Sequence, residues 1–244
     1  MFGRQAGGSA MTLSEALQIP RGVTAFVGGG GKTTAIARLA RELSAFGRVL
    51  IATTTRIHPP EHPILIDPGE DALREAFQHH AVVAVGSACG EKLGPLKNLP
   101  ALCVLSDYAL IEADGARGLP LKAPAAHEPV IPENAQMVVA VAGMDGIGLP
   151  VSAVHRPEHY AALIGKPLDA PVTPGDVAKV LLHPAGQRKD AICPWRVLLN
   201  KADDEERLAL ARACAKRIPG ITVIASLKSE PVFIEVWRDG ACAS

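Results

Sequence analysis

The sequence has few aromatic residues and no long apolar run. Phe, Trp and Tyr make up 4% of the 244 residues, although 48% of the chain is hydrophobic. The core must therefore consist mainly of Ala, Val, Leu and Ile, which is typical of parallel sheets covered by helices. No apolar run approaches the ~20 residues that a membrane-spanning helix needs, so no membrane segment is expected.

An excess of charge and a cysteine framework are also missing. Lys and Arg total 25, as do Asp and Glu, and no basic patch is interleaved with aromatic residues, so nucleic-acid binding is not expected. The five cysteines are widely spaced without a CxxC pair, which argues against disulfides or structural zinc and favours a cytoplasmic protein. Segment 1–11 is rich in Gly and Ser without an apolar core, and we expect a disordered leader there rather than a signal peptide.

Short apolar runs alternate along the chain with segments of helical period. This βαβ pattern predicts an α/β fold with a mostly parallel sheet flanked by helices. The connection 114–132 is rich in Gly and Pro and long for a compact domain, which is typical of a functional or mobile loop. We expect strands at 23–27, 49–52, 82–85, 109–113, 137–142, 196–199 and 222–225, and helices at 33–45, 71–77, 174–182 and 205–217.

Four glycines followed by Lys-Thr-Thr separate the first expected strand from the first expected helix. Glycines let backbone N–H groups turn inward around phosphate oxygens, and the start of the helix aims its positive end at them. In this interpretation Lys32 bridges the β- and γ-phosphates, Thr33 binds Mg²⁺ and Thr34 contacts the α-phosphate. The expected phosphate-binding residues are Gly28, Gly29, Gly30, Gly31, Lys32, Thr33 and Thr34.

This phosphate loop departs from the standard pattern G-x-x-x-x-G-K-[ST]. The first standard glycine position is Phe26, and a loop that starts at Gly28 is two residues short, which would weaken its hold on phosphates. A dinucleotide fingerprint would need Gly where Thr33 stands. The remaining alternative is a glycine-rich turn with an incidental lysine. The motif predicts a P-loop NTPase-like fold, with a flexible leader and short helix over 1–21 and one nucleotide-binding domain with an elaborated middle over 22–244.

The tetrad Asn200-Lys201-Ala202-Asp203 directly follows an apolar strand-like run, as does the guanine-recognition element of GTPases. The Asp203 carboxylate would accept hydrogen bonds from guanine N1–H and the exocyclic amine. Adenine presents an acceptor at N1, which would cost about 1–3 kcal/mol. Lys201 would lie over the base, and Asn200 would tie the tetrad to the phosphate loop. The same residues also make a good loop and N-cap before a helix, but downstream of a P-loop they favour GTP over ATP.

Two carboxylates, Glu112 and Asp114, stand at the end of the expected strand 109–113. Strand alternation places them on one face, where nucleotide-binding sheets present an acid associated with Mg²⁺. Either would bind the Mg²⁺ water shell or orient the attacking water, and a solvated strand end is the alternative. Residues 112–115 also form E-x-x-G, a variant of the GTPase D-x-x-G motif found in nickel metallochaperone GTPases. The candidate catalytic residues are Lys32, Glu112, Asp114 and Arg117, and the candidate metal ligands are Thr33, Glu112 and Asp114.

The middle segment 112–132 reads EADGARGLPLKAPAAHEPVIP. With VGGGGKTT, ATTTRI, GMDGIG and VHRPE, it resembles the selenium-dependent hydroxylase accessory proteins of the YqeC type, over roughly Val23 to the end. The resemblance implies a part in the maturation of selenium-dependent molybdenum hydroxylases, with such a hydroxylase as the client. Arg117 would then contact the γ-phosphate or an anionic second ligand, such as the phosphate of a molybdopterin-type cofactor, molybdate or a reduced selenium species. Lys122 stands in the same loop, near the expected nucleotide. Solvated or structural roles are the alternatives for these residues and for His127 and Glu128.

Three functions remain open from the sequence. The first is a slowly hydrolysing GTP-binding accessory protein, whose segments Thr53–Arg56 and Asp114–Lys122 switch with the nucleotide. The second is an ATP-dependent small-molecule kinase or ligase, in which the tetrad is only a turn. The third is a non-catalytic cofactor carrier or scaffold, which the shortened loop favours. A homodimer formed around the nucleotide is compatible with each.

Overall fold

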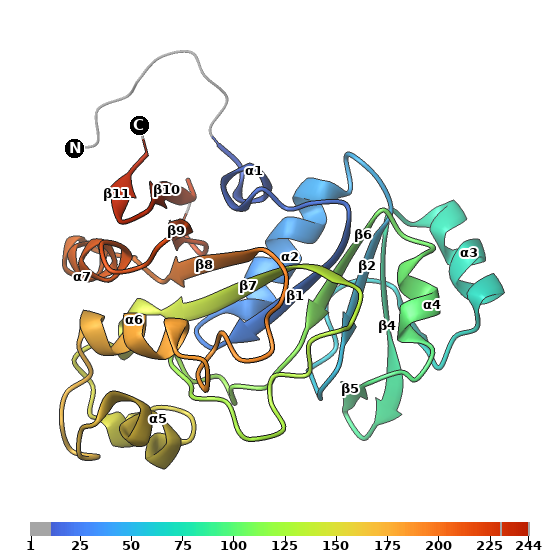
Figure 1. Cartoon of the computed structure of the whole chain (residues 1–244). Coiled ribbons are helices and arrows are strands. Elements are labelled where there is room, and N and C mark those ends of the chain that lie inside the picture. Colours follow the sequence, from blue (N-terminus) through green and yellow to red (C-terminus); the bar gives the residue numbers. More distant parts are fainter. Residues whose placement is uncertain (1–10, 230, 244) are drawn as a thin grey trace.

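The computed structural model describes residues 11–229 and 231–243. Its centre is a mixed β-sheet with the strand order β11-β10-β9-β8-β7-β1-β6-β2-β4-β3, to which β5 adds beside β4 (Figure 1). The strands are β1 Gly22–Gly28, β2 Val49–Thr53, β3 Ile64–Ile66, β4 Val82–Cys89, β5 Lys92–Gly94, β6 Tyr108–Glu112, β7 Ala135–Gly143, β8 Trp195–Asn200, β9 Ile221–Ser226, β10 Phe233–Arg238 and β11 Ala241–Cys242.

All neighbouring strands from β9 to β3 along this order run parallel, whereas β5, β10 and β11 pair antiparallel. The predicted mostly parallel, helix-flanked α/β fold is therefore confirmed. Because the central strands are parallel, their carboxyl ends gather at one edge of the sheet. The α-helices are α1 Leu13–Leu17, α2 Lys32–Leu43, α3 Glu70–His79, α4 Leu99–Cys103, α5 Pro157–Ile164, α6 Pro174–Leu182 and α7 Glu205–Ala215.

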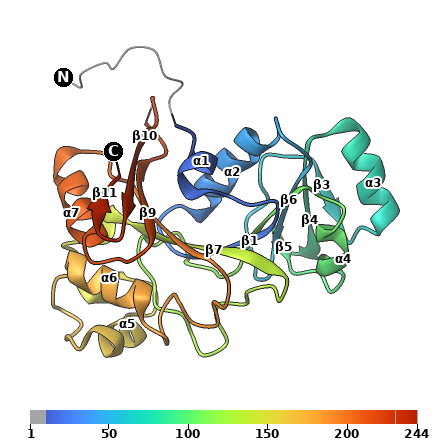
Figure 2. The ribbon, with the colours of Figure 1, turned by 45° about the horizontal axis from the view of Figure 1, so that its top comes forward.

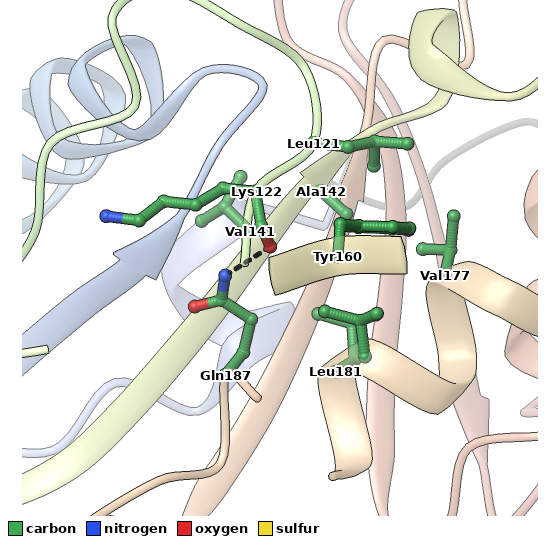
Figure 3. Close-up of a pocket in the computed structure, with 9 residues that line it drawn as sticks. Leu121, Lys122, Val141, Ala142, Tyr160, Val177, Leu181 and Gln187 are labelled. Atoms are coloured by element: carbon green, nitrogen blue, oxygen red, sulfur yellow. Dashed lines mark hydrogen bonds between the residues drawn. The ribbon is translucent and has the colours of Figure 1, made fainter. Parts of the chain in front are cut away.

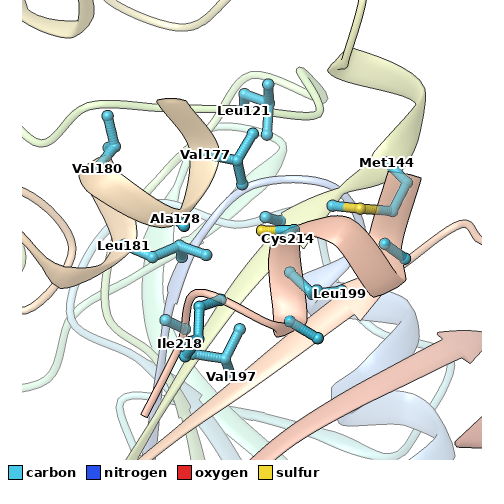
Figure 4. Packing of buried hydrophobic residues seen from close by; sticks show 14 of the residues in the cluster. Leu121, Met144, Val177, Ala178, Val180, Leu181, Val197, Leu199, Cys214 and Ile218 are labelled. Carbon is cyan, nitrogen blue, oxygen red and sulfur yellow. The ribbon is translucent and has the colours of Figure 1, made fainter. Parts of the chain in front are cut away.

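Strand alternation divides the core between the two faces of the sheet. Ala25 and Val27 of β1 belong to the same cluster as α5, α6 and α7, whereas Phe26 packs with α1 and α2. Figure 2 shows α5 and α6 on the opposite side of the sheet from α1 and α2. Figure 4 shows Val197 and Leu199 of β8 close to the buried Cys214 of α7. None of the helices in the described residues has the length and apolar character that crossing a membrane requires.

Each strand and helix expected from the sequence is present, with ends that differ by at most two residues except at the end of β4, where the difference is four. The short helix expected within residues 1–21 is α1, which a Thr12 capping box begins. Most of the expected disordered leader lies outside the described residues. Sequence reasoning missed six further strands and α-helices, most of them short, because a brief hydrophobic period does not stand out. These are β3, β5, β10, β11, α4 and α5.

Candidate functional site

A cavity of about 710 Å³ lies along the carboxyl edge of the sheet. This volume falls within the ~300–1,000 Å³ of typical ligand pockets, and ligands of open α/β folds bind at this edge. Two residues expected in the site, Gly28 and Asp114, are not among its lining residues. The expected residues that do line the cavity are Gly29, Gly30, Gly31, Lys32, Thr33, Thr34, Glu112, Arg117, Asn200, Lys201 and Asp203.

The phosphate loop follows β1 in a conformation that needs glycine. Gly28, Gly30 and Gly31 have φ values of 95°, 79° and 121°. The amide of Gly28 donates to the Asp114 carboxylate, and the amides of Gly29 and Gly30 donate to backbone carbonyls at 2.9 and 3.1 Å. The expectation that the glycine amides turn inward around phosphate is therefore wrong for these three. The short loop lies so close to β7 that a Cβ on Gly28 would come 2.2 Å from a carbonyl oxygen.

The remaining amides of the motif are differently placed. Those of Gly31, Lys32, Thr33 and Thr34 donate to no acceptor among residues 11–229 and 231–243. Gly31 is the N-cap of α2 and brings no side-chain cap, so the first turn presents its amides and the positive end of the helix dipole without a protein acceptor. Because Gly31–Thr34 line the cavity, this helix start has the donor arrangement that phosphate groups bind.

Lys32 is held by acids beneath this helix start. Its ammonium lies 3.1 Å from Asp114 Oδ1 and 3.7 Å from Glu112 Oε1, and it also donates to the Gly28 carbonyl. Only 4% of its side chain is exposed. Burial alone would lower the pKa of Lys32, but the charges of Asp114 and Glu112 outweigh burial and raise it. Lys32 is therefore charged but already neutralised in the ligand-free protein.

Glu112 and Thr33 meet at the cavity wall, where the Thr33 hydroxyl donates to Glu112 Oε2 at 3.3 Å. Burial raises the pKa of Glu112, the Lys32 charge opposes this rise, and the Asp114 charge adds to it. Mg²⁺ usually takes one or two carboxylates together with water and substrate phosphates, so it needs no larger cluster of acids. The hydroxyl and carboxylate pair fits such an ion.

Asp114 has different surroundings from Glu112. Its side chain is completely buried, and its oxygens accept from the Gly28 amide at 3.1 Å and contact Lys32 and Lys122 at 3.1 and 3.0 Å. Asp114 therefore lies behind the phosphate loop and fixes its backbone. Of the two acids that strand alternation placed on one face, Glu112 is the one that lines the cavity.

The middle segment brings further charges into the interior. Lys122 is completely buried, lies 2.7 Å from Glu128 and donates to the Gly115 carbonyl at 2.6 Å. Arg156 contacts both oxygens of Glu128, at 2.5 and 3.0 Å. In Figure 3 the Lys122 side chain points away from the apolar residues of a small interior cavity, while its carbonyl accepts from the Gln187 amide. Lys122 and Glu128 therefore brace the segment from inside, which is the structural alternative that the sequence left open for both.

Arg117 does line the cavity, as do its neighbours Gly115, Ala116, Gly118 and Leu119, and the Arg117 side chain is exposed. His127 is also exposed, but it does not line the cavity. The segment therefore divides into a buried part, which holds the phosphate loop, and an exposed turn at Arg117.

The tetrad after β8 contacts the phosphate loop as the sequence predicted. Asn200 Nδ2 donates to the Gly30 carbonyl at 2.9 Å, so Asn200 ties the two loops together. Asp203 lies at the cavity and accepts from the Ser226 hydroxyl at 2.5 Å. Lys201 pairs with Asp145 at 2.7 Å, a contact that the sequence did not indicate.

Sequence reasoning missed the loop after β9. Ser226 orients Asp203, the Leu227 amide donates to Asn200 Oδ1 at 3.4 Å, and Lys228 lines the cavity. The signal was present, because Ser-Leu-Lys follows the last expected parallel strand and must therefore lie at the same edge as the tetrad. Asp145, from the GMDGIG motif after β7, is at this edge for the same reason.

Two comparisons place the chain among known proteins. The model of the family described as "YqeC protein" matches residues 24–158, which include the phosphate loop, Glu112 and the middle segment. The chain is also 35% identical over 198 residues to the protein named "Uncharacterized protein YqeC" of Escherichia coli (strain K12), with 75% of this chain and 76% of that protein covered. No solved structure matches the chain significantly. The chain belongs to the YqeC family.

Proposed function

We propose that this protein binds Mg²⁺–GTP in the cavity at the carboxyl edge of the sheet. One observation carries the proposal: the amides of Gly31–Thr34, which have no acceptor in the described part of the chain, line the same cavity as the Asp203 carboxylate, and the Asn200–Gly30 hydrogen bond links their loops. The first group suits a polyphosphate and the second suits a base, so together they match the two ends of a nucleotide.

Guanine is the base that Asp203 suits. The Ser226 hydroxyl donates to Asp203 Oδ1, Asp203 Oδ2 lies 3.6 Å from Arg207, and 42% of the Asp203 side chain is exposed. A carboxylate accepts from guanine N1–H and its exocyclic amine, whereas adenine offers an acceptor at N1 and leaves the carboxylate unsatisfied. This asymmetry favours GTP over ATP.

The surroundings of Lys32 support modest affinity and slow hydrolysis. The phosphates must compete with Asp114 and Glu112 for its ammonium, and the amides of Gly28–Gly30 are already bonded. The same features favour the alternative of a non-catalytic nucleotide-dependent carrier. The proposed cellular role is a GTP-controlled step in the maturation of a selenium-dependent molybdenum hydroxylase, and its support is the resemblance of the middle segment and its accompanying motifs.

Nucleotide titrations test the base assignment. We expect the wild type with Mg²⁺ to prefer GTP to ATP, and Asp203→Asn to lose about 10–100-fold in GTP affinity, corresponding to ~1–3 kcal/mol, while gaining affinity for xanthosine triphosphate. Asp204→Asn is the matched control, since Asp204 caps α7 and Asn caps a helix equally well. Lys32→Ala should weaken the binding of every nucleoside triphosphate. Equal binding of GTP and ATP by all four proteins would refute the assignment.

Hydrogen exchange tests the phosphate end independently of the base. A non-hydrolysable GTP analogue with Mg²⁺ should slow exchange at the amides of Gly31–Thr34, which have no acceptor among the described residues. The amides of Gly29 and Gly30 should change little, because carbonyls already hold them. Protection confined to other parts of the chain would show that the nucleotide binds elsewhere.

A further inference from the structure

The order of the strands sets the order of the groups along the cavity. Strand β9 ends at Ser226, the loop after β8 carries Asp203, the phosphate loop follows β1, and β6 ends at Glu112. Beyond β6 come β2 and then β4 with β5, which bring Arg56 and Lys92 to the same cavity. The cavity therefore continues past the phosphate loop, on the side away from the proposed base.

The wall at this far end is held in place by backbone pairing. Ile57 and Leu93 exchange backbone hydrogen bonds of 3.0 and 2.9 Å, and both side chains are buried. Successive residues of an extended segment point to opposite faces, so the residues next to Ile57 and Leu93 point away from the buried side. Arg56 and Lys92, which adjoin this bridge, are accordingly exposed and line the cavity.

Arg117 reaches the cavity from the middle segment. It lies in a turn closed by the Leu119 amide and the Ala116 carbonyl, at 2.9 Å, and its φ of 51° is in the left-handed region. That conformation costs a non-glycine residue about 1–2 kcal/mol. The Leu119 carbonyl accepts from the Gly30 amide at 3.1 Å, so the turn that displays Arg117 is fastened to the phosphate loop.

These three cations have no acidic partner among the described residues. Arg56, Lys92 and Arg117 form no salt bridge within 11–229 and 231–243, whereas Lys32, Lys122 and Lys201 in the neighbouring regions are all paired. Glu112, an acid that lines the same cavity, is engaged by Thr33 and Lys32. Unpaired cations in a concave wall create a local positive potential that attracts anions.

We propose that Arg56, Lys92 and Arg117 form a second binding site, next to the terminal phosphate of the nucleotide, for a small molecule that carries a phosphate group. Guanidinium groups bind phosphate oxygens through paired N–H donors, and a lysine adds a point charge. The position relative to the nucleotide rests on the proposed function, whereas the anion site itself rests only on these cations. Such a site would bring a phosphorylated ligand and a nucleotide into contact in one cavity.

Titration with inorganic phosphate tests the site. The protein is first saturated with a non-hydrolysable GTP analogue and Mg²⁺, so that the position of the γ-phosphate is filled. We expect phosphate to bind without displacing the analogue. The affinity for phosphate should fall roughly tenfold in each of the variants Arg56→Gln, Lys92→Gln and Arg117→Gln. The control Lys97→Gln removes another exposed lysine that does not line the cavity, and it should leave phosphate binding unchanged.

Several outcomes would overturn the second site. These are failure of phosphate to bind the loaded wild type, displacement of the analogue by phosphate, and an equal loss in Lys97→Gln. The three variants could instead weaken binding of the GTP analogue but not of GDP, while phosphate fails to bind. In that case the cations bind the γ-phosphate and not a second ligand. Thermal unfolding of each variant checks that it is folded, as expected for exposed side chains.

A nucleotide-free titration separates this proposal from the proposed function. If no nucleotide binds, phosphate is titrated into the free wild type, Arg56→Gln and Lys32→Ala. If Arg56→Gln loses phosphate binding and Lys32→Ala retains it, the anion site is supported even though the GTP proposal has failed. Loss in Lys32→Ala alone would assign the phosphate to the helix start and refute the second site.

Discussion

Lys122 carries its charge into a completely buried position, where Asp114, Glu128 and the Gly115 carbonyl surround it. Such an arrangement adds little net stability over apolar packing, but removal of one partner leaves buried charge without compensation. Since Asp114 also holds the Gly28 amide and Lys32, the Lys122 ammonium indirectly fixes the phosphate loop. A charged residue outside the cavity thereby controls the shape of the site.

Lys122→Met should lower the free energy of unfolding by about 3–5 kcal/mol, because Asp114 and Glu128 each lose a buried counter-charge while the apolar stem is kept. Urea unfolding measures the loss. Lys97→Met is the control, since Lys97 is exposed and forms no salt bridge among the described residues, and it should change stability by less than about 0.5 kcal/mol. Equal stability of the two variants would contradict the role of Lys122.

The phosphate loop and the tetrad behave as one element because Gly31 lets them approach. A Cβ at Gly31 would lie 2.3 Å from Asn200 Nδ2, and the φ of 121° is strained for any other residue. The Gly30 carbonyl that Asn200 binds directly precedes this glycine. A side chain at position 31 would therefore push the base loop away from the phosphate loop.

Gly31→Ala should destabilise the protein by about 1–3 kcal/mol and reduce affinity for GTP, because it strains the backbone and displaces Asn200. Urea unfolding and nucleotide titration measure the two effects. Gly175→Ala is the matched control, since its Cβ would meet no atom closer than 3.8 Å and Ala favours the α6 helix. That control should keep both stability and affinity. Normal GTP binding by a folded Gly31→Ala protein would contradict the coupling of the loops.

Two titrating groups link the stability of the whole molecule to pH. Burial, with the Arg156 and Lys122 charges, lowers the pKa of His155 from 6.5 to about 4. Burial would raise the pKa of Glu128, but hydrogen bonds from Lys122 and Arg156 lower it from 4.5 to about 2. In both cases the unfolded chain binds the proton at a higher pH than the folded chain, so acid favours unfolding.

The free energy of unfolding should therefore fall from pH 6.5 to about 4 as unfolded His155 takes up its proton, and fall further from 4.5 to about 2 through Glu128. Urea unfolding between pH 3 and 8 measures this profile. His155→Gln should flatten the upper part, whereas the control His127→Gln, at an exposed histidine, should preserve it. A wild-type profile that stays level below pH 6.5 would rule out this linkage.

The local order of residues determined three features: the parallel sheet, the helix that starts at Lys32, and the tetrad that contacts the phosphate loop. Hydrophobic period and glycine spacing are local properties, and parallel strands bring their carboxyl ends together wherever the chain connects them. The pairing of Asn200 with the phosphate loop was predictable for this reason. Which of Glu112 and Asp114 lines the cavity could not be predicted from the sequence, because strand alternation assigns both residues to the same face.

Only the tertiary structure decided where each charge and each amide is satisfied. Buried Asp114 is paired with Lys32 from the start of α2 and with Lys122 from its own segment, and the amides of Gly29 and Gly30 meet carbonyls of β7 and the middle segment. The bridge between Ile57 and Leu93, which exposes Arg56 and Lys92 at the cavity, also joins separate parts of the chain. The sequence determines which groups are present and the period of their elements, whereas their partners depend on long-range contacts that local pattern does not encode.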